Sequence, residues 1–433
     1  MERLIPIRAA FKPAPNPNGF LMFKKVNFPA ACFLAGFVFF SHLPCVRADF
    51  KLMDAIEEFG EKRFVKPTPT RLKAGPFRLH PSLRSSSTFD SNILLEHEDP
   101  RGDVVFNIQP GAIIELPIDK HQLAAGYEAD FEIFSKSRDH RQNDQNQNFF
   151  SLLDLNFPSW YVNVLERFSE TSGRSGTTFT SRIPRYDQSI QPKAGYRWKR
   201  FTFETGFRHV VRDFRQQVND ALDFQEVGFS GVIYYDLFAR LKALVEYQLS
   251  QIDYDDDFTR KGTFNQSRIG FDGEPVRNLK VKARLGMQFR NYQVSSEPDF
   301  YSWVGSVWAE YQIRLNLKLT LEAAREPVEA TFQNVNFYRE HRLGLGVEYS
   351  PWRRWTLFSR WDYIRDGYAE RATLDGSTRF RRDSHYNGRY GIRYGLTEWL
   401  RLELAYDHLN RRSNFSSLSY VDHRVSLASV LSY

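Results

Sequence analysis

Cysteine is nearly absent from this sequence of 433 residues, and its only two copies, Cys32 and Cys45, lie close to the amino terminus. The chain after Ala48 therefore has no side chain that could form a disulfide or a thiolate metal site. A cysteine-free chain is compatible with export through an oxidising compartment but does not require it.

Long apolar runs are also missing. The longest, Phe28 to Phe40, has about 13 residues, whereas a helix needs roughly 20 to cross a bilayer. The run follows two lysines and precedes Val46 and Ala48, which is the pattern of a cleaved secretory signal peptide. We expect residues 1–48 to be an upstream extension plus that signal peptide, with cleavage after Ala48.

Net charge is small once this leader is set aside. The whole sequence carries a formal charge of +7, but residues 1–48 hold six basic side chains against the single acid Glu2. The remainder is therefore about +2. A charge this small gives no electrostatic reason for a nucleic-acid partner, and we expect none.

Recognisable catalytic motifs are absent too: there is no His-Glu-x-x-His, phosphate-binding glycine loop or nucleophile elbow. Asp383, Ser384 and His385 form the one tight group of hydrolase type. The acids between Asp253 and Asp257 lack the ligand spacing of a Ca²⁺ loop. We therefore predict no enzyme, no catalytic residue, no cofactor and no metal, and keep an outer-membrane barrel hydrolase as a minor alternative.

The sequence is rich in aromatic residues, and its apolar and polar residues alternate. Aromatics reach 15% although the mean hydropathy is only −0.51. From Pro76 onward, apolar and polar residues alternate, which predicts strands with one apolar and one polar face. In the clearest stretch the apolar set is Leu279, Val281, Ala283, Leu285, Met287 and Phe289, and the set between them is Lys280, Lys282, Arg284, Gly286, Gln288 and Arg290.

Connection lengths decide between a soluble sandwich and a membrane barrel. About 18 strands can be counted, and their links alternate between tight turns and long polar loops, as a membrane barrel requires. The tight links include 156–159, 198–200, 236–239, 273–278, 313–316, 350–354 and 395–399, and the long links include 136–147, 171–185, 212–220, 255–262, 326–335 and 365–383. We predict an all-β fold, a closed antiparallel transmembrane β-barrel of about 18 strands, with 16 as the next choice, short periplasmic turns and long extracellular loops.

The barrel is expected to span residues 76–433 and to follow a separate segment, 49–75. Within that segment, Asp49 to Phe64 has helical spacing and is interpreted either as a plug in the lumen or as a periplasmic tail. The chain ends in a strand with Leu431 and the terminal aromatic Tyr433. This ending resembles the signal read by the barrel-assembly machinery, so we expect that machinery as a partner during insertion.

Short motifs near both ends of the barrel carry a family resemblance. They are Ser87-Thr88-Phe89-Asp90-Ser91-Asn92-Ile93, Gly102-Asp103-Val104, Gln109-Pro110-Gly111 and Asn410-Arg411-Arg412-Ser413-Asn414-Phe415, followed by Tyr420 and Val425. The chain resembles a bacterial family of putative outer-membrane β-barrel porins, the second so named, across residues 76–433. The resemblance implies a location in the cell outer membrane, a porin, and a frequent association with exopolysaccharide synthesis and export genes.

Charged residues on the inward faces are the candidate pore lining. Lys280, Lys282, Arg284 and Arg290 form a basic stripe, joined by Arg389, Arg393 and Arg401, and acids are supplied by Glu128, Asp130, Glu132, Glu204, Glu322 and Glu403. Charges inside a barrel need water or partners, so they predict either a salt-bridged interior or a selective pore. An open lumen would be biased toward anions by the stripe on residues 280–290.

The predicted function is a porin-like channel for passive passage of small polar solutes or of a surface polysaccharide. The alternative is a plugged structural or docking barrel of an envelope or exopolysaccharide export complex. The segment 49–75 and an infolded loop at 365–383 are the candidates for obstruction. Outer-membrane lipid is an expected partner in either case, and polysaccharide export components are expected on the narrower interpretation.

Overall fold

Antiparallel strands make up most of the chain that the computed structural model describes, which is residues 72–136, 144–174, 182–255, 261–293, 299–330 and 336–433. All of these belong to one structural unit, Cys45–Tyr433. The strands are β1 (Leu72–Ala74), β2 (Phe77–Asp90), β3 (Asp103–Ile118), β4 (His121–Phe134), β5 (Asp144–Asn156), β6 (Trp160–Thr171), β7 (Arg185–Trp198), β8 (Phe201–Phe214), β9 (Phe224–Phe238), β10 (Leu241–Tyr254), β11 (Gly262–Val276), β12 (Leu279–Tyr292), β13 (Phe300–Arg314), β14 (Leu317–Glu329), β15 (Phe337–Trp352), β16 (Trp355–Leu374), β17 (Ser377–Gly395), β18 (Leu400–Ser413) and β19 (Tyr420–Ser432). Short 3₁₀ helices, η1 (Gln217–Leu222) and η3 (Ser416–Leu418), lie in the connections after β8 and β18.

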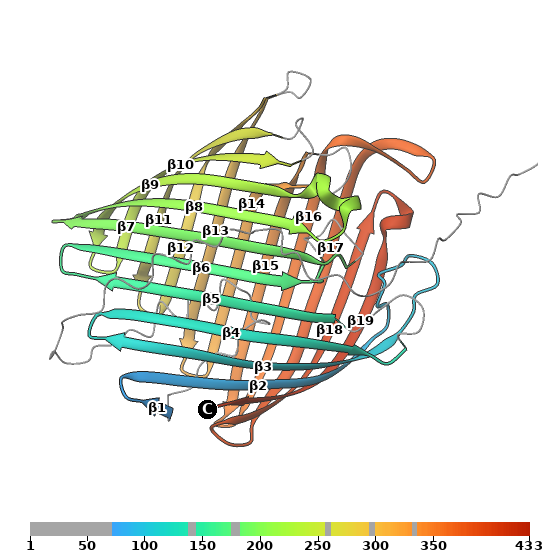
Figure 1. Ribbon diagram of the computed structural model, residues 1–433, viewed down its shortest axis with the longest axis horizontal. Coiled ribbons are helices and arrows are strands. Elements are labelled where there is room, and N and C mark those ends of the chain that lie inside the picture. Colours follow the sequence, from blue (N-terminus) through green and yellow to red (C-terminus); the bar gives the residue numbers. More distant parts are fainter. Residues whose placement is uncertain (1–71, 137–143, 175–181, 256–260, 294–298, 331–335) are drawn as a thin grey trace, which may run out of the picture. The chain divides into compact units, whose positions relative to one another are not determined.

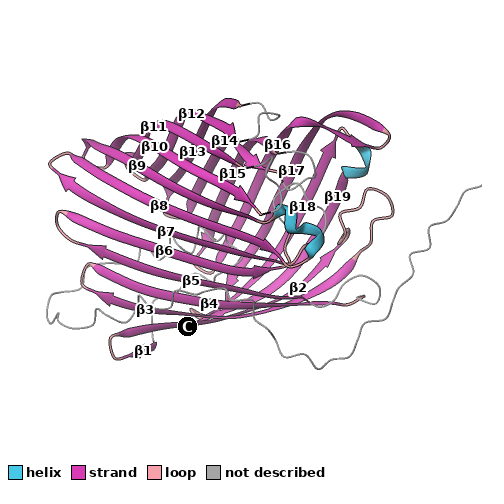
Figure 2. Cartoon of the chain, turned by 45° about the horizontal axis from the view of Figure 1, so that its top comes forward, coloured by secondary structure: helices cyan, strands magenta, loops and turns pink. Residues whose placement is uncertain are grey.

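The strands close into a ring. Each strand from β2 to β18 pairs with the next one in sequence, and β19 pairs with β2, so β2–β19 form an antiparallel barrel of eighteen strands in the described chain (Figures 1 and 2). The three-residue β1 folds back on the start of β2, with Leu72 opposite Leu79. The predicted closed antiparallel barrel of about 18 strands is confirmed, and closure leaves no long edge of unpaired backbone groups.

Alternation determines which face of each strand points outward. On β12, Leu285 and Phe289 are 57% and 50% exposed, whereas Gln288 and Arg290 are 4% and 6% exposed. Successive side chains of a strand point to opposite faces, so the apolar set covers the outside of the ring and the polar set lines the inside.

The connections also alternate in length as predicted. Short turns join β3 to β4, β5 to β6, and each following odd strand to the next even one through β17 and β18. Most of the longer connections join the even strands to the next odd ones, and they lie at the opposite end of the ring. We call the two ends the short-turn end and the long-loop end.

One predicted loop is wrong. Residues 365–383 were expected to form a long connection, but β16 runs on to Leu374 and β17 starts at Ser377. Asp375 and Gly376 between them have φ values of 51° and 67°, as a two-residue hairpin turn requires. The Asp375 carboxylate accepts hydrogen bonds from the Ser416 hydroxyl and the Ser417 N–H, both at 3.2 Å. This segment is therefore an extended hairpin tied to η3 and not an infolded loop.

The carboxy terminus lies at the seam where the barrel closes, beside the start of β2 (Figure 1). The Tyr433 N–H donates to the Pro81 carbonyl at 3.1 Å, and the Ser432 N–H donates to the Trp399 carbonyl at 3.0 Å. Leu431 and Tyr433 line a small apolar groove of about 270 Å³ at this seam. Their role in assembly remains a prediction.

Several sequence predictions fall outside the described residues. These are the signal peptide, the Asp49–Phe64 segment, and the acids Asp256 and Asp257. Among the residues that are described, none of the helices has both the length and the apolar character needed to cross a membrane.

Candidate functional site: the charged lumen

All eight residues predicted to line a pore occupy inward positions. They lie on β12, β17 and β18, on the faces opposite to exposed apolar residues such as Leu285, Tyr390 and Leu404. The inward residues are Lys280, Lys282, Arg284, Arg290, Arg389, Arg393, Arg401 and Glu403. Their positions agree with the alternation, but their electrostatic surroundings differ.

Three of these residues, Lys280, Arg393 and Glu403, belong to a continuous chain of ion pairs, which we call the ion-pair belt. It runs from β12 to β2 through residues of alternating sign: Lys280–Glu310 (3.5 Å), Glu310–Lys318 (3.8 Å), Lys318–Glu348 (2.9 Å), Glu348–Arg393 (3.0 Å), Arg393–Glu403 (3.1 Å) and Glu403–Arg84 (3.5 Å). Arg389 adds a branch, because it contacts Glu403 and Asp407, each at 2.9 Å. The belt therefore neutralises three of the seven basic side chains that the sequence placed on this wall, Lys280, Arg389 and Arg393.

Two further members of the predicted basic stripe are also compensated. Arg284 lies 3.3 Å from Asp272 and 3.6 Å from Glu246. Arg290 is almost fully buried, is paired with Glu329, and lies between the rings of Phe264 and Phe337. The stripe on β12 is thus salt-bridged over most of its length, as one of the two interpretations of the sequence expected.

Lys282 is different. Among the described residues, no carboxylate lies within ion-pair distance of Lys282. Its ammonium lies 5.8 Å from the ring centroid of Trp308. Arg401 likewise has no ion pair within the described ranges.

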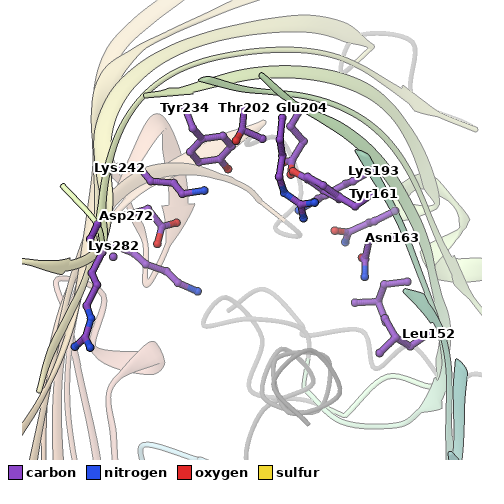
Figure 3. A pocket seen from close by; sticks show the side chains of 16 residues that line it. Leu152, Tyr161, Asn163, Lys193, Thr202, Glu204, Tyr234, Lys242, Asp272 and Lys282 are labelled. Carbon is purple, nitrogen blue, oxygen red and sulfur yellow. The ribbon is translucent and has the colours of Figure 1, made fainter. Parts of the chain in front are cut away.

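Lys282 lines a cavity of about 600 Å³ on the lumen wall formed by β5–β12. Figure 3 shows Lys193, Lys242 and Lys282 around the same open space, with the hydroxyl-bearing side chains of Tyr161, Thr202 and Tyr234 between them. We call this site the lysine cavity and define it by Lys193, Lys242, Lys282, Tyr161, Tyr234 and the apolar residues Leu152 and Leu165.

Both acids that line the lysine cavity, Glu204 and Asp272, have a partner. Glu204 accepts a hydrogen bond from the Tyr161 hydroxyl, and Asp272 is paired with Arg284. Lys193 has no ion pair with any described residue, and Lys242 reaches Asp236 only at 3.8 Å. Five basic side chains, Lys193, Lys242, Lys282, Arg197 and Arg240, line this cavity against the two acids Glu204 and Asp272. The cavity therefore carries an excess of positive charge, and the amines of Lys193 and Lys282 are available to an anion.

Sequence reasoning missed Lys193 and Lys242. The signal was available for Lys242, which alternates with the apolar Leu241 and Ala243 at the start of β10. Lys193 follows Pro192 in a stretch of weaker alternation, and only the strand register shows that it shares a wall with Lys282.

A second lumen cavity, of about 500 Å³, is balanced in charge. The predicted acids Glu128, Asp130 and Glu132 line it, and arginines stand against them. Its basic residues are Arg84, Arg174, Arg182, Arg389 and Arg424, and its remaining acids are Asp90 and Asp407. This cavity offers no excess of either sign.

Asp383, Ser384 and His385, the one group of hydrolase type, do not all lie on the same face of β17. Asp383 and His385 are buried on the inner side of β17, and the His385 ring contacts Asp366 at 3.3 Å. Ser384 lies between them in sequence and therefore points to the outer face. Within the described segments, no cluster of three or more His, Cys, Asp or Glu side chains could hold a metal ion.

Comparisons with known proteins agree with this architecture. A family described as putative beta-barrel porin 2 matches residues 67–433. No curated protein matches the chain in sequence. A porin family and a closed barrel with an apolar outer face locate the chain in the outer membrane and point to a channel rather than an enzyme. In such barrels the short turns are periplasmic and the long loops extracellular.

Several solved outer-membrane proteins are similar to the chain at low sequence identity. OpdK of Pseudomonas aeruginosa, solved with vanillate, is 11% identical with a TM-score of 0.46, over 82% of this chain and 99% of that one. A BenF-like porin of Pseudomonas fluorescens is 12% identical with a TM-score of 0.46, over 82% and 99%. The siderophore receptor PirA of Pseudomonas aeruginosa is 12% identical with a TM-score of 0.41, over 83% and 81%. Likeness at this level says nothing about solutes.

Proposed function

Because the chain belongs to the family described as putative beta-barrel porin 2, we propose that it forms a passive outer-membrane channel for small polar solutes and favours small organic anions. The observation that supports this selectivity is the lysine cavity, where Lys193 and Lys282 have no carboxylate partner among the described residues.

The physical argument has two steps. A barrel of 16 to 18 strands is wide enough to leave an aqueous channel unless something fills it. Fixed charge on a wall of low dielectric constant raises the local concentration of counter-ions, so uncompensated lysines draw anions into the bore. The ion-pair belt does not compete with this effect, because its charges cancel within a few ångströms.

The apolar side of the cavity narrows the class of solute. Leu152 and Leu165 line the same space as the lysines, and Figure 3 places Leu152 across it from Lys282. A solute with a carboxylate or phosphate at one end and an apolar body at the other would contact both walls. Small organic anions have this form, whereas fully hydrated inorganic anions would use only the lysines.

Two other roles from the sequence remain as narrower or competing proposals. A surface polysaccharide, if acidic, would meet the same lysines, and export components would then be partners. A plugged docking barrel would instead use the ion-pair belt as a rigid frame and would not conduct.

Single-channel recording in planar bilayers tests the proposal. The mature chain should give discrete open levels in 1 M KCl. Closed traces both from this chain and from a variant lacking residues 49–71 would favour the docking barrel. Closed traces from the first and open levels from the second would mean that the amino-terminal segment controls the channel.

A further inference from the structure

A second set of unpaired charges lies on the outer surface of the barrel, away from the lumen. Strand register aligns Arg325 on β14 with His341 on β15, His341 with Arg365 on β16, and Arg365 with Ser384 on β17, which in turn pairs with Arg412 on β18. Arg339 lies two residues from His341 on β15, and Arg382 lies two residues from Ser384 on β17. Both are opposite Gly367 of β16. We call Arg325, Arg339, His341, Arg365, Arg382 and Arg412 the outer basic girdle.

The girdle points toward the membrane side. Residues that pair directly across two strands share a face, and Leu343 and Tyr386, which alternate in step with girdle residues, are exposed on the outside. The Arg325 guanidinium lies 4.0 Å from the ring centroid of Trp303, and that of Arg412 lies 5.5 Å from the ring of Tyr386. Both rings are exposed aromatics of the outer surface.

The five arginines of the girdle lack counter-charges. Within the described residues, Glu329 is the one Asp or Glu at an outward position of the alternation on β13–β19, and its carboxylate is taken by the buried Arg290. None of the six girdle residues has an ion pair with a described residue. The other side of the barrel differs, because the outward Glu170 of β6 is paired with Arg215 at 2.8 Å. The side of the barrel formed by β14–β18 thus carries unpaired positive charge on its outer surface.

The height of the girdle matches the outer boundary of the membrane. Arg325 lies eight residues beyond Leu317, where β14 starts at the short-turn end, and Arg412 lies twelve residues beyond Leu400, where β18 starts. A tilted strand climbs roughly 2.5 Å per residue along the membrane normal, so these positions are about 20–30 Å above the periplasmic turns. The apolar band of such barrels is about 25 Å tall.

We propose that the outer basic girdle binds the phosphate groups of a phosphorylated glycolipid in the outer leaflet. The guanidinium group matches phosphate oxygens with two parallel hydrogen bonds. Neighbouring strands are about 4.8 Å apart, so arginines on adjacent strands can reach one phosphate together. The acyl chains would then pack against the apolar surface below, which includes Leu343, Leu345, Trp361 and Leu404. This site lies outside the lumen and is independent of the proposed channel.

Native mass spectrometry of the full mature chain in a non-ionic detergent tests the proposal. The probe is a diphosphorylated lipid A, compared with the same lipid after removal of both phosphates. The intact protein should bind the phosphorylated lipid about tenfold more than the dephosphorylated one. The variant Arg339→Gln/Arg365→Gln/Arg382→Gln/Arg412→Gln should lose that preference, and its single-channel conductance should remain.

A matched control removes the same charge at the opposite boundary. Lys199→Gln/Arg314→Gln/Arg353→Gln/Arg354→Gln changes four exposed side chains of the short turns and should bind the lipid as the unaltered chain does. If the fourfold girdle variant fails to fold, Arg365→Gln/Arg412→Gln should still reduce binding by about threefold.

Three results would overturn the proposal. They are unchanged lipid binding by the folded girdle variants, an equal loss in the control variant, or displacement of the lipid by an equal concentration of inorganic pyrophosphate. The last result would show recognition of free phosphate rather than of a lipid.

Discussion

Arg393 on β17 and Glu348 on β15 form an ion pair at 3.0 Å across the intervening strand β16. Phe358 of β16 lies beneath the contact, with its ring centroid 4.1 Å from the Arg393 guanidinium carbon. The ion-pair belt thus links strands that share no backbone hydrogen bonds and fixes their relative positions on the lumen side.

Breaking the belt should destabilise the barrel. Glu348→Gln leaves Lys318 and Arg393 without their shared carboxylate, and because both cations are partly exposed we expect a loss of about 1–2 kcal/mol in the free energy of unfolding. Urea unfolding in lipid vesicles, followed by tryptophan fluorescence, measures it. Glu326→Gln is the control, since Glu326 is exposed and has no ion pair with a described residue. Equal losses in the two variants would argue against a stabilising belt.

Gly126 is required by the packing of Phe150. A Cβ atom at position 126 would lie 2.2 Å from the Phe150 ring, inside a buried cluster with Ile113 and Leu152. We expect Gly126→Ala to cost about 1–3 kcal/mol, and Phe150→Leu in the same chain to recover part of it. Gly231→Ala, where a Cβ would meet nothing within 4 Å, should be nearly neutral in the same assay. Additive losses in the double variant would contradict this account.

Asp223 should make the connection between β8 and β9 sensitive to pH. Its carboxylate accepts a hydrogen bond from the Phe214 N–H at 2.7 Å. Burial, together with the nearby acids Asp213, Asp220 and Asp255, raises its pKa from 3.8 to about 6, although the hydrogen bond from Phe214 acts in the opposite direction. The closed connection therefore binds a proton more tightly than the open one, so its stability is full below pH 3.8 and falls as the pH rises through 6.

Hydrogen exchange of the Phe214 amide, corrected for the intrinsic rate, measures this effect. Protection should be greater at pH 4.5 than at pH 7.5, and Asp223→Asn, which keeps an acceptor but cannot ionise, should remove the difference. An unchanged pH dependence in Asp223→Asn would assign it to another group.

Tyr433 should be needed for assembly. Its deletion removes the hydrogen bond to the Pro81 carbonyl and one wall of the seam groove. We expect a severalfold lower fraction of heat-modifiable barrel in isolated membranes, whereas Tyr433→Phe, which keeps the ring and the backbone N–H, should assemble normally. Equal yields from the deletion and from the unaltered chain would exclude a role for the terminal residue.

The barrel could be predicted from sequence because each strand residue faces either lipid or the lumen, and its own polarity indicates which. Leu285 and Arg284 are assigned to opposite faces by their own polarity, without knowledge of any partner. The β16–β17 hairpin was missed because its outer part lies beyond the membrane, where no apolar face is imposed on it. The Asp375-Gly376 pair was nevertheless a recognisable turn signal.

The electrostatics of the lumen could not be predicted in the same way. Alternation shows that Lys280 points inward, but its partner Glu310 is placed by the register between β12 and β13. The contact between Glu403 and Arg84 exists only because the last strands pair with the first. Which lysines stay unpaired is therefore a property of the closed ring.

The reversal potential under a KCl gradient tests the central claim most directly. The unaltered channel should favour anions, and Lys193→Gln/Lys242→Gln/Lys282→Gln should move the reversal potential toward that of a cation-selective pore. The control variant Lys199→Gln/Arg353→Gln/Arg354→Gln, which removes three charges outside the lumen, should behave as the unaltered chain. A channel that conducts with the same reversal potential after loss of all three cavity lysines would contradict the account.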